Sequence, residues 1–275
     1  MDSKLFPFAG RHAVQSAICA LTFAGELDTS KFEGGITKAQ EALKSVLPVM
    51  EPLQTVTLQF GPGLTGAPNS PRIGGWQFSL PGAQVDVRQD EIPVRRMVTL
   101  QSNRLIVVEN DYNRWANFKS LTNTVLREIL AVSDDRPLVD VALAYNDVFI
   151  WKDVPEKAGA ATVFSPDSPL LTPNVFSVGT RYFHSNHGFI SDDLPDGADS
   201  LVENVNVART PESSSTFDRF VVTTEHRLVS KQPIYGATNI QEFVMPALEH
   251  LHRRNKMMLG SLLVPEVKEM IKLGV

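Results

Sequence analysis

Residues 95–151 decide the fold of this chain, and they read RRMVTLQSNRLIVVENDYNRWANFKSLTNTVLREILAVSDDRPLVDVALAYNDVFIW. Two short runs near the start, 97–101 and 105–109, are rich in β-branched and apolar residues. The residues between them, Ser102, Asn103 and Arg104, tolerate the positive φ angles of a tight hairpin turn. These features predict two antiparallel strands joined by a turn.

An amphipathic helix is predicted after the hairpin, because apolar side chains recur every three or four positions. The stripe consists of Trp115, Phe118, Thr122, Val125 and Ile129, widened by Leu121, Leu126 and Leu130. Residues 138–151 then return as a strongly apolar strand. A sheet with a helix on one face is a scaffold, and the sequence of residues 95–151 contains no catalytic constellation.

The flanking sequence predicts further strands and helices of the same kind. Alternating apolar residues predict strands, and apolar residues at helical spacing predict helices. In chain order, the expected elements are a strand at 12–24, a helix at 28–47, strands at 55–60, 76–80, 175–183, 200–208 and 217–230, a long helix from Asn239 that Gly260 and Ser261 interrupt, and a short helix from Pro265. We therefore predict an α+β fold in which antiparallel β-sheets are each packed against a long amphipathic helix, either in one compact body or as two similar lobes.

A proline-rich segment indicates where the chain divides. Residues 153–174 contain Pro155, Pro166, Pro169 and Pro173, which favour an extended arm or linker. We predict an N-terminal α+β lobe at 1–152, a linker or arm at 153–174, and C-terminal strands followed by helices at 175–275.

Composition restricts the classes of partner. The 275 residues carry a net charge of −5 and have an isoelectric point near 5.7, which argues against a general binder of nucleic acids or acidic membranes. Cys19 is the single cysteine, so an intrachain disulfide framework and a thiolate zinc cluster are excluded. No apolar run reaches the ~18 residues that span a bilayer. We expect a cytoplasmic protein that does not enter a membrane.

Residues 61–66, Gly-Pro-Gly-Leu-Thr-Gly, match the G-x-G-x-x-G pattern of dinucleotide-binding proteins. That chemistry requires a helix whose N-terminal amides hold the pyrophosphate. Pro68 and Pro71 follow the motif and prevent such a helix, and Pro62 removes one of the amides. We therefore predict a loop here and no bound cofactor.

Two histidines and two aspartates form the most chemically suggestive group in the sequence. His184 and His187 are three residues apart, and Asp192 and Asp193 follow closely. Imidazole and carboxylate groups are ligands for zinc and other divalent ions, so this segment predicts a metal-dependent enzyme or a metal-binding protein. The alternative interpretation is a solvated polar turn, because no helix fixes the spacing. His226, on a predicted strand, is expected to be a surface cross-strand partner.

The last long helix carries a basic stretch that includes His252, Arg253, Arg254 and Lys256. These side chains predict contact with a nucleic acid or an acidic partner. The competing interpretation is a solvated helix face with cations near the helix C-terminus, since the stretch lacks interleaved aromatic residues and the chain is acidic overall.

Residues 105–118, 143–146 and 248–256 carry a resemblance that covers scattered parts of most of the chain. They resemble an uncharacterised, sporadically distributed family of bacterial proteins of similar length. The chain departs from the family pattern at Ala144, where an arginine is usual, and at Asn146, which directly follows Tyr145. The resemblance implies no activity and no functional residue. The patchy distribution implies a role in a bacterial or phage conflict or defence system.

These observations favour a non-enzymatic protein-interaction or structural scaffold protein. The sequence lacks nucleophile and phosphate-binding signatures such as G-x-S-x-G and the Walker A lysine. We expect the protein to self-associate or to present a helix or a sheet edge to a protein partner. A metal-dependent function through His184 and His187 is the first alternative, and nucleic-acid binding through the basic stretch is the second.

Overall fold

The computed structural model describes residues 4–55, 72–82, 94–132, 136–152, 159–177, 182–211 and 217–274. These residues form a mixed α/β structure with antiparallel β-sheet and four α-helices, which confirms the coarse form of the fold prediction. Contacts group the chain into two compact units. Unit 1 contains Met1–Ile18, Val141–Lys231 and Pro246–Val275, and unit 2 contains Cys19–Asp140 and Gln232–Met245.

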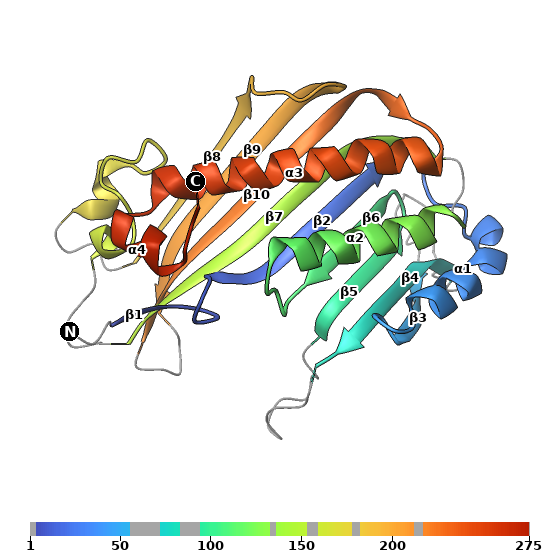
Figure 1. The fold of residues 1–275 in the computed structure, drawn as a ribbon, viewed down its shortest axis with the longest axis horizontal. Helices are drawn as coiled ribbons and strands as arrows, with labels where there is room; N and C mark the ends of the chain where they lie inside the picture. The colour runs from blue at the N-terminus through green and yellow to red at the C-terminus, as the bar shows by residue number, and fades with distance from the viewer. Residues whose placement is uncertain are drawn as a thin grey trace, which may run out of the picture. The chain divides into compact units, whose positions relative to one another are not determined.

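Unit 2 is built on four antiparallel strands. They are β3 (Val49–Thr55), β4 (Arg72–Pro81), β5 (Val94–Gln101) and β6 (Arg104–Glu109), and β2 (Val14–Phe23) lies next to β6 in the strand order (Figure 1). The hairpin predicted from the sequence is confirmed, because β5 and β6 pair in antiparallel register. Ser102 in its turn has a φ of 48°, the positive angle that a tight turn requires.

The strand predicted at 55–60 lies, apart from Thr55, outside the described residues. Strand β3 ends at Thr55, and residues 56–71, which include the glycine motif at 61–66, lie outside the described part of the chain. The sequence does not predict β3, because Pro52 cannot donate a ladder hydrogen bond. Strand β3 is at the end of the strand order, and an edge strand is where a proline is tolerated.

Both helices predicted for unit 2 are present. Helix α1 (Thr29–Leu43) is capped by Asp28, whose carboxylate accepts a hydrogen bond from the Ser30 amide of the first turn. Helix α2 (Trp115–Leu130) buries the predicted apolar stripe from Phe118 to Leu130. The Phe32 ring of α1 stacks on Trp76 of β4, with centroids 5.3 Å apart. These contacts fix the start of α1 over the sheet of unit 2.

Unit 1 contains the strand order β2–β7–β10–β9–β8, with β1 (Leu5–Pro7) beside β7 (Leu138–Trp151). Strands β8 (Phe183–Ser191), β9 (Ala198–Pro211) and β10 (Asp218–Ile234) pair in antiparallel register. The predictions of β7, β9 and β10 are confirmed. The start of the strand predicted at 175–183 is wrong, because Val175 and Phe176 belong to a 3-10 turn, η2, at Pro173–Phe176. Residues 178–181 of that prediction lie outside the described part of the chain, and Phe183 is the first residue of β8.

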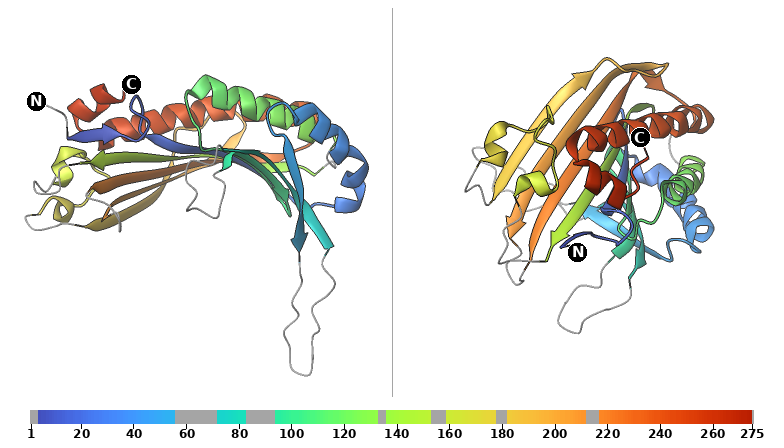
Figure 2. Two further views of the ribbon diagram at one scale, coloured as in Figure 1. Left: turned by 90° about the horizontal axis from the view of Figure 1, so that it is seen from below. Right: turned by 60° about the vertical axis from the view of Figure 1, so that its left-hand side comes forward.

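The C-terminal part of helix α3 (Ala237–Leu262) and helix α4 (Pro265–Met270) lie on one face of the unit 1 strands (Figure 2). Helix α3 continues through Gly260 and Ser261, so the predicted interruption there is wrong. Within the described ranges, no helix combines the length and apolar character needed to cross a membrane.

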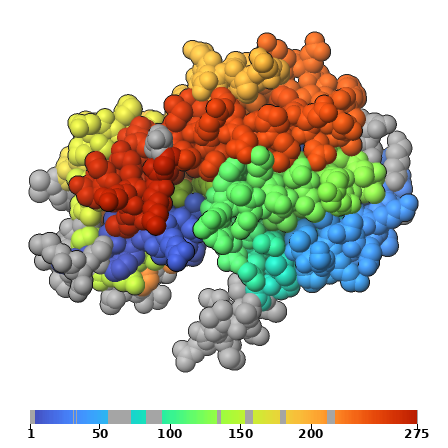
Figure 3. Space-filling model, in the orientation of Figure 1, coloured from blue at the N-terminus to red at the C-terminus, as the bar shows by residue number. Residues whose placement is uncertain are grey.

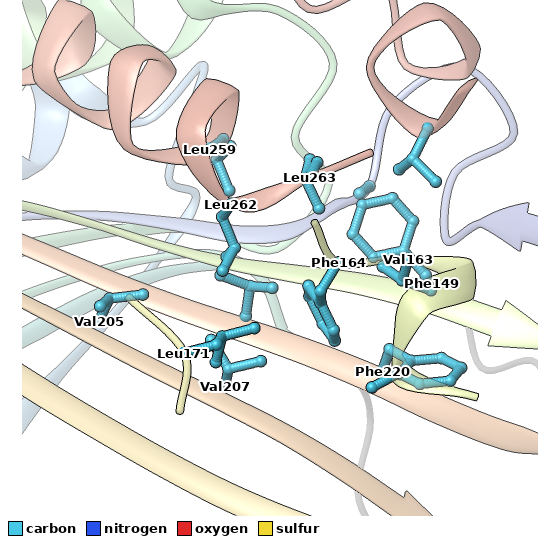
Figure 4. Close-up of a cluster of buried hydrophobic side chains, with 14 of the residues drawn as sticks. Phe149, Val163, Phe164, Leu171, Val205, Val207, Phe220, Leu259, Leu262 and Leu263 are labelled. Atoms are coloured by element: carbon cyan, nitrogen blue, oxygen red, sulfur yellow. The ribbon is translucent and has the colours of Figure 1, made fainter. Parts of the chain in front are cut away.

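A cluster of buried apolar side chains joins α3 and α4 to the sheet of unit 1 (Figure 4). The Phe164 ring meets Phe220 of β10 edge to face, with centroids 5.9 Å apart. Val163 and Phe164 follow the 3-10 turn η1 (Ala160–Thr162) and belong to this cluster. Residues 159–174 of the predicted linker therefore pack as part of unit 1, whereas residues 153–158 lie outside the described residues.

Candidate interaction surface

A row of polar side chains lies between α3 and strands β9 and β10 of unit 1. Along β10, alternate residues from Phe220 to Leu228 are buried, and this set includes Thr224 and His226. The β9–β10 register places His226 directly opposite Glu203. The Nδ1 atom of His226 is 2.8 Å from Oε1 of Glu203, and both side chains are 0% exposed. A carboxylate and an imidazole are thus buried together between the sheet and α3.

Arg254 of α3 completes a buried ion pair with Glu203. Its Nη2 donates to Glu203 Oε2 at 2.6 Å, its Nε donates to Oε1 at 3.1 Å, and its Nη1 donates to Asp193 Oδ2 at 3.2 Å. The fork of the guanidinium matches the two carboxylate oxygens. Burial acts to raise the pKa of Glu203, but the hydrogen bonds and charges of His226 and Arg254 outweigh it and lower the pKa to about 2. Glu203 is therefore an ionised anchor for α3.

Two neutral hydrogen bonds extend this contact along α3. Thr224 Oγ1 donates to Asn255 Oδ1 at 2.7 Å, and the Tyr145 hydroxyl of β7 is 3.0 Å from Nδ1 of His252. Burial, assisted by the nearby charge of Lys256, lowers the pKa of His252 to about 4 although Glu249 acts in the opposite direction. The imidazole is therefore neutral at neutral pH, and α3 is held at several points rather than by one ion pair.

Strand β7 also carries a buried acid, Asp147. Its side chain is almost fully buried, and its Oδ2 atom has no hydrogen-bond partner in the described structure. Burial raises the pKa of Asp147 to about 7. The carboxyl group is therefore near half protonation at neutral pH, unlike the ionised Glu203.

The basic stretch predicted on the last helix does not form a single exposed face. The side chain of Arg254 points to Glu203 and Asp193, and His252 contacts Tyr145. Arg253 is exposed and is 3.4 Å from Nδ1 of His250, whereas Lys256 is half-buried. The interpretation as a nucleic-acid contact stays a prediction, and Arg253 is the member of the predicted group that is open to solvent.

The four residues predicted to bind a metal are not brought together. His184 and His187 belong to strand β8, not to a loop, and their three-residue spacing places them on opposite faces of that strand. His187 Nε2 is 3.2 Å from Ser185 Oγ, and Asp193 is engaged by Arg254. No group of three potential metal ligands occurs among the residues that the structure describes. The prediction that His226 pairs across strands is confirmed, but its predicted surface position is wrong.

Strand β8 forms one end of the strand order. On one side it pairs with β9 over its whole length, from Phe183 opposite Arg209 to Ser191 opposite Leu201. On its other side, no strand of the described chain is its partner. Its sequence, Phe-His-Ser-Asn-His-Gly-Phe-Ile-Ser, contains no lysine, arginine, aspartate, glutamate or proline. These are the residues with which natural proteins protect a free edge.

The C-terminal end of β8 exposes apolar side chains. Phe189 is 37% exposed and Ile190 is 70% exposed, and Leu194 just beyond the strand is 38% exposed. Consecutive strand residues point to opposite faces, so Phe189 and Ile190 flank the free edge on both sides. In the β8–β9 register Phe189 is opposite Glu203, the residue that binds Arg254 of α3. Figure 3 shows the end of β8 and the start of β9 beside α3.

Glu203, Phe189 and Ile190 are not among the site residues predicted from the sequence. A signal for Glu203 was present, because Leu201, Val205 and Val207 make the other positions of its strand face apolar. A carboxylate in such a row requires a buried partner. Comparison of the chain with models of known protein families and with curated proteins gives no match.

Proposed function

We propose that this protein is an interaction and scaffold protein that self-associates through the free edge of β8. The observation that carries the proposal is the combination at this edge of an unprotected strand with exposed Phe189 and Ile190. An edge strand presents a row of unpaired amides and carbonyls, which is a template for a further strand. Adding a strand from another chain is a recurring mode of protein recognition.

A second copy of the chain is the occupant that fits this edge. An antiparallel pair of identical strands has two-fold symmetry, which is the commonest symmetry of soluble oligomers. In a register centred on His187, the partner's strand would place Ser185 opposite Phe189 and His184 opposite Ile190, so that each exposed apolar side chain gains a cross-strand neighbour. A nine-residue strand pair is a small interface, so we expect a weak dimer that dissociates on dilution.

The ion pairs of Arg254 with Glu203 and Asp193 support this surface. Glu203 lies opposite Phe189 in β9, and Asp193 follows the end of β8 closely. Arg254 binds both carboxylates, and His250 Nε2 donates to the Asp193 carbonyl at 3.1 Å. These contacts hold the edge in place before a partner arrives, and a preorganised surface loses less entropy on binding.

The proposal includes the finer fold and the biological setting predicted from the sequence. In it, α2 and α3 each cover one group of antiparallel strands as lids of a scaffold, leaving edges free for assembly. A setting in a bacterial or phage defence system follows from the resemblance of residues 105–118, 143–146 and 248–256, and self-assembly is compatible with such a setting.

Light scattering on fractionated protein over a wide concentration range tests the dimer. The wild-type chain should change from monomer to dimer with concentration, and Ile190→Lys should stay monomeric because a lysine blocks edge pairing. Met257→Lys is the matched control, since Met257 is also an exposed apolar residue of unit 1 but lies on α3. A wild-type chain that is monomeric at every concentration, or a dimer that survives Ile190→Lys, would refute the proposal.

Oxidative cross-linking tests the register. Opposite residues of an antiparallel pair have Cα atoms about 4.5–5.5 Å apart, which is compatible with a disulfide. His187→Cys should therefore give a covalent dimer, whereas His184→Cys, displaced from the two-fold axis, should not. The native Cys19 does not interfere, because it is buried and burial raises its pKa to about 12. Equal cross-linking of both variants would contradict the centred register.

A further inference from the structure

Unit 2 contains a cavity that is separate from the β8 surface. Its volume is about 390 Å³, which lies within the range of small-molecule sites. Four segments line it: the connection from β2 into α1, the end of β3, the start of β4, and the end of β5 with its turn. Most of the lining is polar, with Thr55 and Gln101 contributing neutral hydrogen-bonding groups.

Two opposite charges face this cavity without being paired. Glu26 and Arg72 are the ionisable residues among its described lining. Neither side chain has an ion pair or a hydrogen bond with another described residue, although both border the same space. A molecule that bridges the two charges would satisfy both of them.

The walls of the cavity are fixed by the backbone. A Cβ atom at Gly74 would lie 1.8 Å from Oγ1 of Thr55, and one at Gly75 would lie 2.1 Å from the Leu100 carbonyl oxygen. The two glycines therefore let β3, β4 and β5 approach closely, next to a register shift between Leu53 and Gln54. Such irregularities often occur beside binding sites.

The opposite wall is tied to the β5 turn by hydrogen bonds. The Ser102 carbonyl accepts from the Leu27 amide at 2.7 Å and from Nη1 of Arg136 at 2.8 Å. The Leu27 bond holds the segment that carries Glu26 against the end of β5. The two charges are thus presented from segments whose backbones are mutually constrained, which favours recognition of a ligand of defined length.

We propose that this cavity binds a free α-amino acid, with the ammonium group on Glu26 and the carboxylate on Arg72. A ligand with one charge would leave the other residue unmatched, whereas a zwitterion matches both. Arg72 offers two parallel donors to a carboxylate, and Thr55 and Gln101 supply further hydrogen bonds. The remaining volume accommodates the amino-acid side chain together with water.

Titration calorimetry with the full chain tests this inference, using each of the twenty common L-amino acids as a probe. At least one should bind saturably. Its N-acetyl derivative, which lacks the ammonium group, and its carboxamide, which lacks the carboxylate, should each bind at least about tenfold more weakly. Failure of all twenty to bind, or equal binding of either derivative, would overturn the proposal.

Variants locate the site. Arg72→Gln and Glu26→Gln should each weaken binding by about tenfold or more. Arg104→Gln on β6 and Glu51→Gln on β3 are matched controls, because both residues are exposed in neighbouring strands and do not line the cavity. Binding that is unchanged in Arg72→Gln or Glu26→Gln would contradict the assignment. Either result leaves the β8 dimer unaffected, since the two proposals rest on different units.

Discussion

Glu203 lies directly opposite His226 on one side and Phe189 on the other, in the middle of three antiparallel strands. Its carboxylate accepts hydrogen bonds from Arg254, and its Oε1 atom is 2.8 Å from Nδ1 of His226. One buried carboxylate therefore connects the exposed edge strand, the sheet and helix α3. The stability of unit 1 should depend on it strongly.

Replacing Glu203 with glutamine should lower the free energy of unfolding by about 3 kcal/mol, because Arg254 loses its buried counter-charge and keeps only the exposed Asp193 as a partner. Urea denaturation measures the change. Glu225→Gln is the control, since Glu225 is exposed on β10 and its replacement should alter stability by less than about 0.5 kcal/mol. Equal effects of the two variants would show that the ion pair contributes nothing.

The same variant should change the response to acid. The pKa of Glu203 is lowered from 4.5 to about 2 in the folded protein, so folding is favoured by its ionised form. This contribution is complete above pH 4.5 and is lost as the pH falls from 4.5 towards 2. The stability difference between wild type and Glu203→Gln should therefore shrink over that interval.

Asp147 should have the opposite effect on the pH dependence of stability. Burial raises its pKa from 3.8 to about 7, so the folded protein holds a proton that the unfolded chain has released. Stability should fall as the pH rises from about 4 to 7, by an amount on the order of 2–4 kcal/mol. Asp147→Asn should remove this slope and be more stable than wild type above pH 7. Parallel stability curves for the two proteins would contradict the buried, protonated carboxyl group.

His252 should make the protein sensitive to acid in a different interval. Its pKa is lowered from 6.5 to about 4, mainly by burial, so folding favours the neutral ring. Its contribution is complete above pH 6.5 and is lost as the pH falls towards 4. His252→Asn should make the free energy of unfolding less dependent on pH in this range, and the asparagine retains a polar atom near the Tyr145 hydroxyl. His184→Asn, on an exposed residue, should leave the curve unchanged, and thermal unfolding at several pH values measures both.

Two adjacent glycines in α1 should respond oppositely to alanine. A Cβ at Gly34 meets nothing within 4 Å, so Gly34→Ala should stabilise the protein by roughly 0.5–1 kcal/mol through helix propensity. A Cβ at Gly35 would lie 2.7 Å from the Cβ of Val132, so Gly35→Ala should be less stable than Gly34→Ala by about 1–3 kcal/mol. Chemical denaturation compares the two. If both substitutions stabilised the protein, α1 would be free to move away from Val132.

The elements that the sequence predicted correctly are those that depend on nearby residues. The β5–β6 hairpin follows from turn residues between two apolar runs, and α2 follows from apolar spacing within sixteen residues. Strand β8 was missed because its His, Ser, Asn and Gly residues carry little strand preference. Its backbone is extended because each residue from Phe183 to Ser191 pairs with β9.

The predicted sites illustrate the same division. His184 and His187 are close in sequence, but the pleat of β8 directs them to opposite faces. Glu203, His226 and Arg254 show no local pattern, because 23 positions separate the first two and 51 separate Glu203 from Arg254. The cavity in unit 2 likewise combines Glu26 and Arg72 from segments that the sequence places far apart.

The sequence by itself determined the alternation of strands and helices, since hydrophobic spacing, turn residues and caps act over one or two turns of chain. Only the tertiary structure decided which charges leave water, which strand stays at the edge and which unpaired groups share a cavity. Desolvation and pairing depend on the segment that packs against a residue, and that segment is tens of positions away in this protein.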